Sequence, residues 1–107
     1  MLTLQIKRNE FEAIASGKNK IEWRSPSRYN KRLLLTKNGD GLFVENTEIK
    51  EIRFVNGYRD NAPKIKLEVL FIRPYRFIRD VNEPENNFRG NEGENAIGIH
   101  LGRIIPE

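Results

Sequence analysis

The sequence contains no cysteine and only one histidine. Without cysteine the chain forms no disulfide and offers no thiolate to a metal ion or to catalysis. Small secreted domains usually need disulfides, so this absence favours a reducing compartment, and we expect the cytoplasm. A lone histidine without a cluster of acidic residues at ligand spacing argues against a metal site, and we expect neither a metal nor a cofactor.

Long apolar runs are absent as well. Nowhere do about 18 apolar residues follow one another, which is the length that a membrane-spanning helix requires. Residues 1–7 lack the basic start and long apolar core of a signal peptide, so we expect none. The chain has 107 residues, 37% of them apolar, which suits one hydrophobic core. We therefore expect a single soluble domain over 1–107, with no membrane partner.

The charge of the chain is unevenly distributed. The net charge is +4, yet residues 18–32 hold six basic side chains and one acid, whereas residues 80–95 hold five acids and one arginine. A basic segment points to a phosphate-bearing partner, and a plain solvated surface is the alternative. We expect 80–95 to form a mobile surface loop, and we hypothesise that it covers the basic face.

Apolar periodicity predicts how the chain begins. Alternation over 2–7 predicts a first strand, and an apolar stripe at helical spacing over 9–15 predicts a short helix. We expect Asn9 and Glu12 to form a capping box at the start of this helix. Gly17 stands where a helix commonly ends in the left-handed conformation.

Further strands are predicted wherever apolar and polar residues alternate, at 18–24, 51–55, 65–72 and 96–105. We expect Pro74 to end the longest of them. Residues 29–35 fit a helix or a strand, and 33–44 cannot be placed in the sheet. Five or six mostly antiparallel strands with one or two short helices indicate an α+β domain built on a curled sheet or small β-barrel.

The strand predicted at 18–24 is the strongest candidate site. Its alternation places Ile21 and Trp23 on one face, which we expect to join the core. The other face carries four charged side chains, Lys18, Lys20, Glu22 and Arg24. Arginine can donate two hydrogen bonds to a phosphate or a base edge, and lysine adds positive charge. A carboxylate between cations stays ionised and accepts hydrogen bonds from amino or hydroxyl groups. We predict a ligand site on this face; an exposed row of salt bridges is the alternative.

These residues resemble a known family. The order strand, helix, glycine, strand over 2–24, with the closing strand at 96–104, resembles the ASCH domain, which has a PUA-like fold. That family carries a Gly-x-Lys-x-x-Glu-x-Arg motif after its first helix. Three of the four motif positions match, at Gly17, Glu22 and Arg24; the lysine position is Asn19, with Lys18 and Lys20 on either side.

The resemblance implies a cleft lined by the motif, with RNA or a nucleotide-like ligand as the partner. Some relatives are amidohydrolases acting on acylated cytidine, and others look like nucleases. In such an enzyme the resemblance implies catalytic roles for Lys20 and Glu22, with a further acid from a later strand, for which Glu68 is the candidate. Asn19 at the lysine position leaves open whether this chain is an enzyme, because a shift of one residue along a strand turns a side chain to the other face. A module that docks an acidic protein is a third reading.

The loop predicted at 56–61 is the second candidate site. Tyr58 offers a stacking face and Arg59 a phosphate contact, the combination that binds single strands. An ordinary turn with Tyr58 folded onto the core is the alternative. Tyr29, in the basic segment, is a weaker case of the same kind. For His100 we prefer a structural role in the last strand, because one histidine without a partner makes no catalytic triad.

Overall fold

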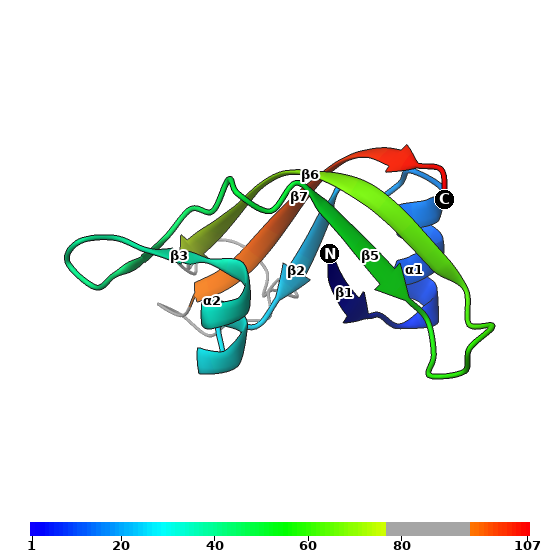
Figure 1. Cartoon of the computed structure of the whole chain (residues 1–107), viewed down its shortest axis with the longest axis horizontal. Helices are drawn as coiled ribbons and strands as arrows, with labels where there is room; N and C mark the ends of the chain where they lie inside the picture. Colours follow the sequence, from blue (N-terminus) through cyan, green and yellow to red (C-terminus); the bar gives the residue numbers. More distant parts are fainter. Residues whose placement is uncertain (77–94) are drawn as a thin grey trace, which may run out of the picture.

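The protein is built on a five-stranded mixed sheet that curls into a half-barrel (Figure 1). The computed structural model describes residues 1–76 and 95–107, so the loop predicted at 80–95 lies outside the described residues except for Asn95. The strands follow one another across the sheet in the order β1 (Leu2–Gln5), β5 (Glu51–Val55), β6 (Lys64–Arg76), β7 (Asn95–Ile105) and β2 (Ile21–Arg24). β1 pairs with β5 in parallel and the other pairs are antiparallel. The expectation of a curled α+β sheet is confirmed; a PUA-like fold stays a prediction.

The hydrophobic core lies on the inner side of the curled sheet. The apolar members of the predicted alternations, such as Ile52, Phe54 and Ile99, are fully buried there. Ile14 of α1 (Arg8–Ala15) and Leu34 of α2 (Arg28–Leu34) join the same cluster, and Figure 1 shows both helices on the inner side of the sheet. Each such side chain contributes about 1.5–3 kcal/mol on burial, so this cluster stabilises the curl.

The first helix begins earlier than predicted. Lys7 is its N-cap residue and makes no side-chain capping bond, so the predicted capping box is wrong. Glu12 instead accepts a hydrogen bond from Nε of Arg8, one turn earlier, at 3.0 Å. Gly17 has a φ of 82°, which confirms the predicted left-handed end of the helix.

The region that could not be placed from sequence contains the second helix and a small ribbon. Ser27 caps α2 by accepting a hydrogen bond from the Asn30 amide at 3.1 Å. β3 (Thr36–Lys37) and β4 (Phe43–Val44) then pair through the predicted turn, where the Asn38 side chain accepts hydrogen bonds from two following backbone amides. In the part of the chain that the structure describes, no helix is long and apolar enough to cross a membrane.

The longest strand does not end at its proline. β6 continues through Pro74, which stands in register with Ile97 of β7. Proline is tolerated in a strand where its missing N–H is not needed for pairing. β5 pairs only with residues 64–68, so at Pro74 β6 has just β7 as a strand neighbour in the sheet. Two register shifts, between Leu67 and Phe71, mark irregular positions that bend this long strand.

Candidate functional site

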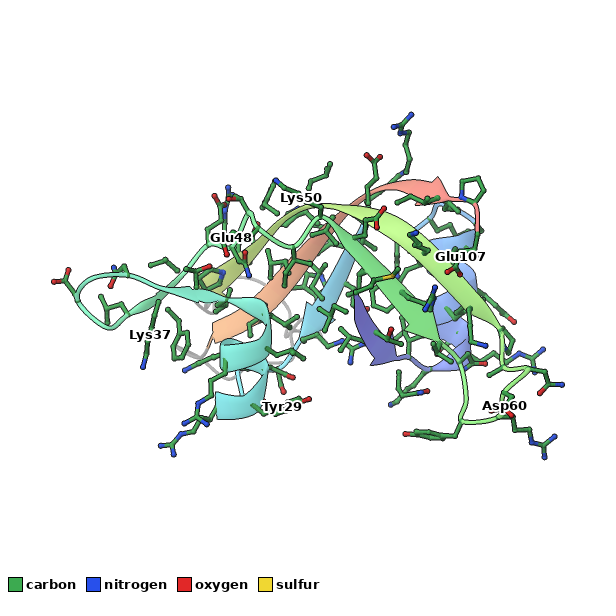
Figure 2. The ribbon with its side chains drawn as sticks, viewed as in Figure 1. Tyr29, Lys37, Glu48, Lys50, Asp60 and Glu107 are labelled. Atoms are coloured by element: carbon green, nitrogen blue, oxygen red, sulfur yellow. The ribbon has the colours of Figure 1, made fainter. Side chains whose placement is uncertain are left out.

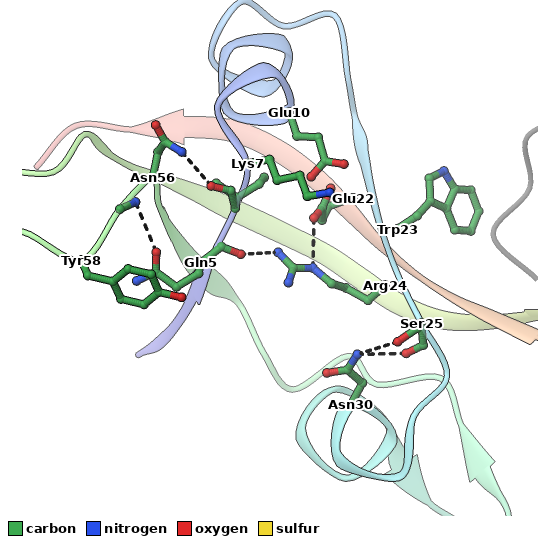
Figure 3. A pocket seen from close by; sticks show the side chains of 12 residues that line it. Gln5, Lys7, Glu10, Glu22, Trp23, Arg24, Ser25, Asn30, Asn56 and Tyr58 are labelled. Atoms are coloured by element: carbon green, nitrogen blue, oxygen red, sulfur yellow. Dashed lines mark hydrogen bonds and ion pairs between the residues drawn. The ribbon is translucent and has the colours of Figure 1, made fainter.

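A cleft of about 730 Å³ opens where the two edge strands of the curled sheet, β1 and β2, approach each other (Figure 3). Its volume lies in the range typical of small-ligand pockets. The walls come from β1 and the turn into α1, from α1, from β2, from the start of α2 and from the loop between β5 and β6. The lining residues are Gln5, Ile6, Lys7, Glu10, Glu22, Trp23, Arg24, Ser25, Asn30, Asn56, Gly57 and Tyr58.

Arg24 joins the two edges of the sheet inside this cleft. Its Nη2 donates a hydrogen bond to the backbone carbonyl of Gln5 on β1, at 2.9 Å. Its Nε lies 3.0 Å from Oε2 of Glu22, close enough for an ion pair, although the contact lacks the geometry of a hydrogen bond. An arginine carries five N–H donors. Nη1 makes no hydrogen bond within the described residues, so Arg24 keeps donors for a ligand.

Glu22 is buried, which reverses the expected orientation of its strand. Glu22 is 4% exposed, whereas Ile21 and Trp23 are only half-buried. The pairing of β2 with β7 explains the reversal, because Glu22 stands directly opposite the core residue Ile99 and therefore shares its face. The prediction that Ile21 and Trp23 form the core face is wrong. A carboxylate is buried at acceptable cost where it is paired, as it is with Arg24.

Trp23 packs on the other face of the sheet. Its ring meets the Tyr75 ring edge-to-face, with centroids 5.3 Å apart. Both rings close over Gly98 of β7, where an added Cβ would lie 2.9 Å from the Tyr75 ring. This position therefore requires glycine, and the close packing there orients β2 so that its charged face turns inward.

The two lysines of the predicted site lie outside the cleft. Gly17, Lys18 and Lys20 are exposed and precede β2, which starts only at Ile21, so they do not lie on the strand face that holds Glu22. Lys7, at the turn from β1 into α1, is the lysine that lines the cleft. Sequence reasoning missed it, because no motif links position 7 with position 22.

Two acids line the cleft, and Glu68 is not one of them. Glu10 of α1 is the second cleft carboxylate, and in Figure 3 the Lys7 side chain extends toward Glu10 and Glu22. Glu68 instead accepts hydrogen bonds from the backbone amide and from Nε of Arg103, at 3.1 and 2.9 Å. These bonds lower the pKa of Glu68 below its usual range. The expected role of Glu68 beside Glu22 is therefore not supported by its position.

Side-chain amides hold the walls of the cleft in place. Asn30 of α2 donates from Nδ2 to the Ser25 carbonyl at 3.0 Å, which ties α2 to the end of β2. Asn56 donates from Nδ2 to the Ile6 carbonyl at 2.9 Å, which ties the β5–β6 loop to the turn after β1. Groups fixed in this way cost less to order when a ligand binds.

The tyrosine predicted at the edge of the site is at its rim. Tyr58 is 89% exposed, so it is not folded onto the core. It lines the cleft, whereas the neighbouring Arg59 is exposed and does not. One aromatic ring is therefore available beside the charged interior.

His100 lies on the opposite face of β7, away from the cleft. It stands in register with Ile21, its Nε2 shares a hydrogen bond of 2.5 Å with the Tyr75 hydroxyl, and its ring stacks on Phe71 with centroids 4.1 Å apart. Burial, and secondarily the charge of Arg73, lower the pKa of His100 below its usual range. In residues 1–76 and 95–107 no group of three or more acids or histidines is placed to hold a metal ion.

Comparison of the chain with protein-family models, with curated proteins and with solved structures finds no match. The likeness to the ASCH domain therefore stays a prediction, which rests on three motif residues of the sequence, Gly17, Glu22 and Arg24.

Proposed function

We propose that the cleft binds one nucleotide unit, with its base against Glu22 and Arg24. The observation that carries this proposal is the pair itself, in which a buried carboxylate acceptor and guanidinium donors lie side by side. Nucleobases place donors and acceptors side by side on their edges, and carboxylate and guanidinium groups read these patterns in proteins. Cytosine, adenine and guanine carry an exocyclic amino group that can donate to Glu22, whereas uracil offers only its ring N3–H, so we expect the cytidine and guanosine nucleotides to bind better than the uridine nucleotide.

The rest of the cleft suits the other parts of a nucleotide. Lys7 supplies a positive charge for a phosphate, and Tyr58 at the rim offers a ring on which a base next to the bound nucleotide can stack. The charged side chains that line the cleft balance, with Lys7 and Arg24 against Glu10 and Glu22. A balanced cleft favours a ligand that combines polar edges with one or two negative charges over a dense polyanion. The resemblance to the ASCH domain supports the same class of ligand.

Hydrolysis of an acylated nucleoside is a second candidate, favoured by the convergence of Lys7 with Glu10 and Glu22 in one cleft. A lysine beside carboxylates can serve as a proton carrier for an attack by water on an acyl carbon. The water adds across the C–N bond of the amide, which releases a carboxylic acid and leaves the free amino group on the base. In this chain Lys7 would take the role of the lysine in the family motif, whose position Asn19 occupies here.

Calorimetric titration with the monophosphates of cytidine, guanosine and uridine tests the binding proposal. Lys7→Ala and Glu22→Gln should each weaken binding of the cytidine nucleotide about tenfold or more. Lys50→Ala is the matched control for Lys7→Ala, because Lys50 is also an exposed lysine and lies outside the cleft. Unchanged affinity in both cleft variants, with folding intact, would refute the proposal.

The same proteins distinguish the enzyme from the binder. Incubation with acylated cytidine should release free cytidine in the wild type and in Lys50→Ala, and neither Glu22→Gln nor Lys7→Ala should turn it over. If the acylated nucleoside binds and stays intact, the hydrolase candidate fails and the binding proposal remains. Binding of an acidic protein in place of every nucleotide would favour the third reading, a protein-interaction module.

A further inference from the structure

Two exposed tyrosines flank the cleft on opposite sides. Tyr29 is 71% exposed and Tyr58 is 89% exposed. Tyr29 lies in the first turn of α2, next to the lining residue Asn30, and Tyr58 belongs to the β5–β6 loop. In Figure 2, Tyr29 and the loop residue Asp60 lie along the same edge of the molecule. We call the first turn of α2 and the tip of this loop the two rims of the cleft.

Each rim also carries cations that have no ion-pair partner among the described residues. α2 has no acidic residue but has three basic ones, Arg28, Lys31 and Arg32. Within residues 1–76 and 95–107 none of the three forms an ion pair, and neither does Arg59 beside Tyr58. One exposed tyrosine is unremarkable on a protein surface. An exposed tyrosine next to unpaired arginine on both sides of one cleft is the combination that binds unpaired bases and their phosphates.

We propose that the nucleotide in the cleft belongs to a single-stranded nucleic acid that passes over both rims. This inference rests on the proposed function and extends it. One flanking base stacks on Tyr29 and another on Tyr58, and the phosphates lie against Arg28, Arg32 and Arg59. The strand must be unpaired, because stacking on a protein ring and insertion of a base into the cleft both need bases that have left a duplex.

The charges favour a nucleic acid over an acidic peptide as the occupant. Arginine side chains attract either ligand, but a peptide carboxylate makes no use of two tyrosine faces. A strand of nucleotides supplies a ring and a negative charge at each step, which matches the repetition of tyrosine and arginine on the two rims. The base-edge groups of Glu22 and Arg24 between the rims then fix the register of the strand.

The test is a series of calorimetric titrations in which the length of the ligand varies. The probes are a cytidine mononucleotide, a trinucleotide and a nonanucleotide, each as RNA and as DNA, together with a nonanucleotide duplex. Affinity should rise at least tenfold from the mononucleotide to the single-stranded nonanucleotide, and fall steeply with salt. The duplex should bind more weakly than the single strand. A preference for RNA over DNA would assign a role to the 2′-hydroxyl group.

Variants of the α2 rim separate this inference from the proposed function. Tyr29→Ala should weaken the nonanucleotide about tenfold and leave the mononucleotide unchanged, whereas Tyr29→Phe should keep the wild-type affinity because it keeps the ring. The double variant Arg28→Ala/Arg32→Ala should weaken the nonanucleotide and reduce its salt dependence. Lys37→Ala/Lys50→Ala removes the same charge away from the cleft and serves as the matched control.

Three results would overturn the inference. If the nonanucleotide binds no more tightly than the mononucleotide, and Glu22→Gln still weakens both, the cleft binds free nucleotides and the strand path is wrong. If no nucleotide of any length binds, the proposed function fails with it. If an acidic peptide binds α2 as tightly as the nonanucleotide and without dependence on Tyr29, the rims form a protein-docking surface.

Discussion

Cations of the sheet and cations of α2 have opposite surroundings. On the sheet, Arg53, Arg73 and Arg103 each contact a carboxylate, and these contacts raise the pKa of each guanidinium above its usual value. On α2, Arg28 and Arg32 have no acidic partner among the described residues. A paired cation has its donors occupied, whereas an unpaired one repels its neighbours and remains available to an anion. The difference indicates that a negatively charged ligand binds more readily at α2 than at the paired arginines of the sheet.

The cleft contains a third kind of charged contact. Arg24 and Glu22 pair as the sheet arginines do, but with side chains only 23% and 6% exposed. Arg103, by contrast, is 88% exposed in its pair. Exposed pairs contribute little to stability, while breaking a buried pair leaves an uncompensated charge in the interior. Burial, more than the presence of a partner, therefore decides which of these arginines the fold depends on.

The largest expected effect is on folding. Arg24→Ala should lower the free energy of unfolding by about 3 kcal/mol, because it removes the cation that pairs with the buried Glu22 and the hydrogen bond that joins β2 to β1. Arg103→Ala, which breaks an exposed pair, should change the stability little. Urea denaturation followed by circular dichroism measures both. Equal losses in the two variants would remove the distinction between buried and exposed pairs.

An intermediate effect is expected from a small polyanion. Tripolyphosphate should raise the thermal unfolding midpoint of the wild type on the order of 5 °C, since a ligand that binds the folded state stabilises it. Arg28→Ala/Arg32→Ala should abolish most of this shift, and Arg53→Ala/Arg103→Ala should retain it. Without the anion, the α2 variant should be at least as stable as the wild type, because it loses repulsion between cations and breaks no ion pair of residues 1–76 and 95–107. An undiminished shift in the α2 variant would show that pairing does not decide where anions bind.

The smallest effect concerns pH and the pairing of Arg73. Burial and Arg73 lower the pKa of His100, and Glu45, which pairs with Arg73, raises it. Glu45→Gln should therefore lower the pKa of His100 further, which NMR can follow directly because the chain has one histidine. An unchanged pKa in Glu45→Gln would show that pairing does not shield the charge of Arg73.

The sign of the accompanying stability change follows from the direction of the shift. A histidine with a lowered folded pKa gives its full contribution to stability above its unfolded pKa of about 6.5. The contribution is lost as the pH falls below that value toward the folded pKa. His100→Gln should remove this part of the pH dependence, and Glu45→Gln should extend the loss to lower pH.

Much of the fold could be predicted wherever a sequence pattern is compatible with only one local structure. The alternation around Ile52 and Phe54 leaves only one face that can be buried, and Gly17 suits a backbone angle that other residues rarely adopt. The order of the strands in the sheet could not be predicted, because the parallel pair β1–β5 joins segments far apart in the chain. The extent of β6 was missed because proline is excluded from a strand that is paired on both sides, whereas among the described strands only β7 pairs with β6 at Pro74.

The candidate site was predicted in part. Glu22, Arg24 and Tyr58, which the sequence analysis named, line the cleft, and Lys18, Lys20 and Arg59 do not. Lys7 and Glu10, which it did not name, line the cleft as well. A motif can name residues that are close in the sequence. It does not identify residues such as Lys7 and Glu10, which are distant from the motif and reach the cleft only through the turn from β1 into α1.

The sequence by itself determined the composition of this surface: a basic segment at 18–32, a charged strand with Ile21 and Trp23 between its charges, and tyrosines beside arginines. Only the tertiary structure decided which face of that strand turns inward. Alternation defines two faces, but the register with β7 and the close packing of Trp23 on Tyr75 and Gly98 select one of them. Since the curl of the sheet brings β2 toward β1, the buried face is the one whose charged groups find partners: Glu22 and Arg24 pair with each other, and Arg24 also donates to the Gln5 carbonyl.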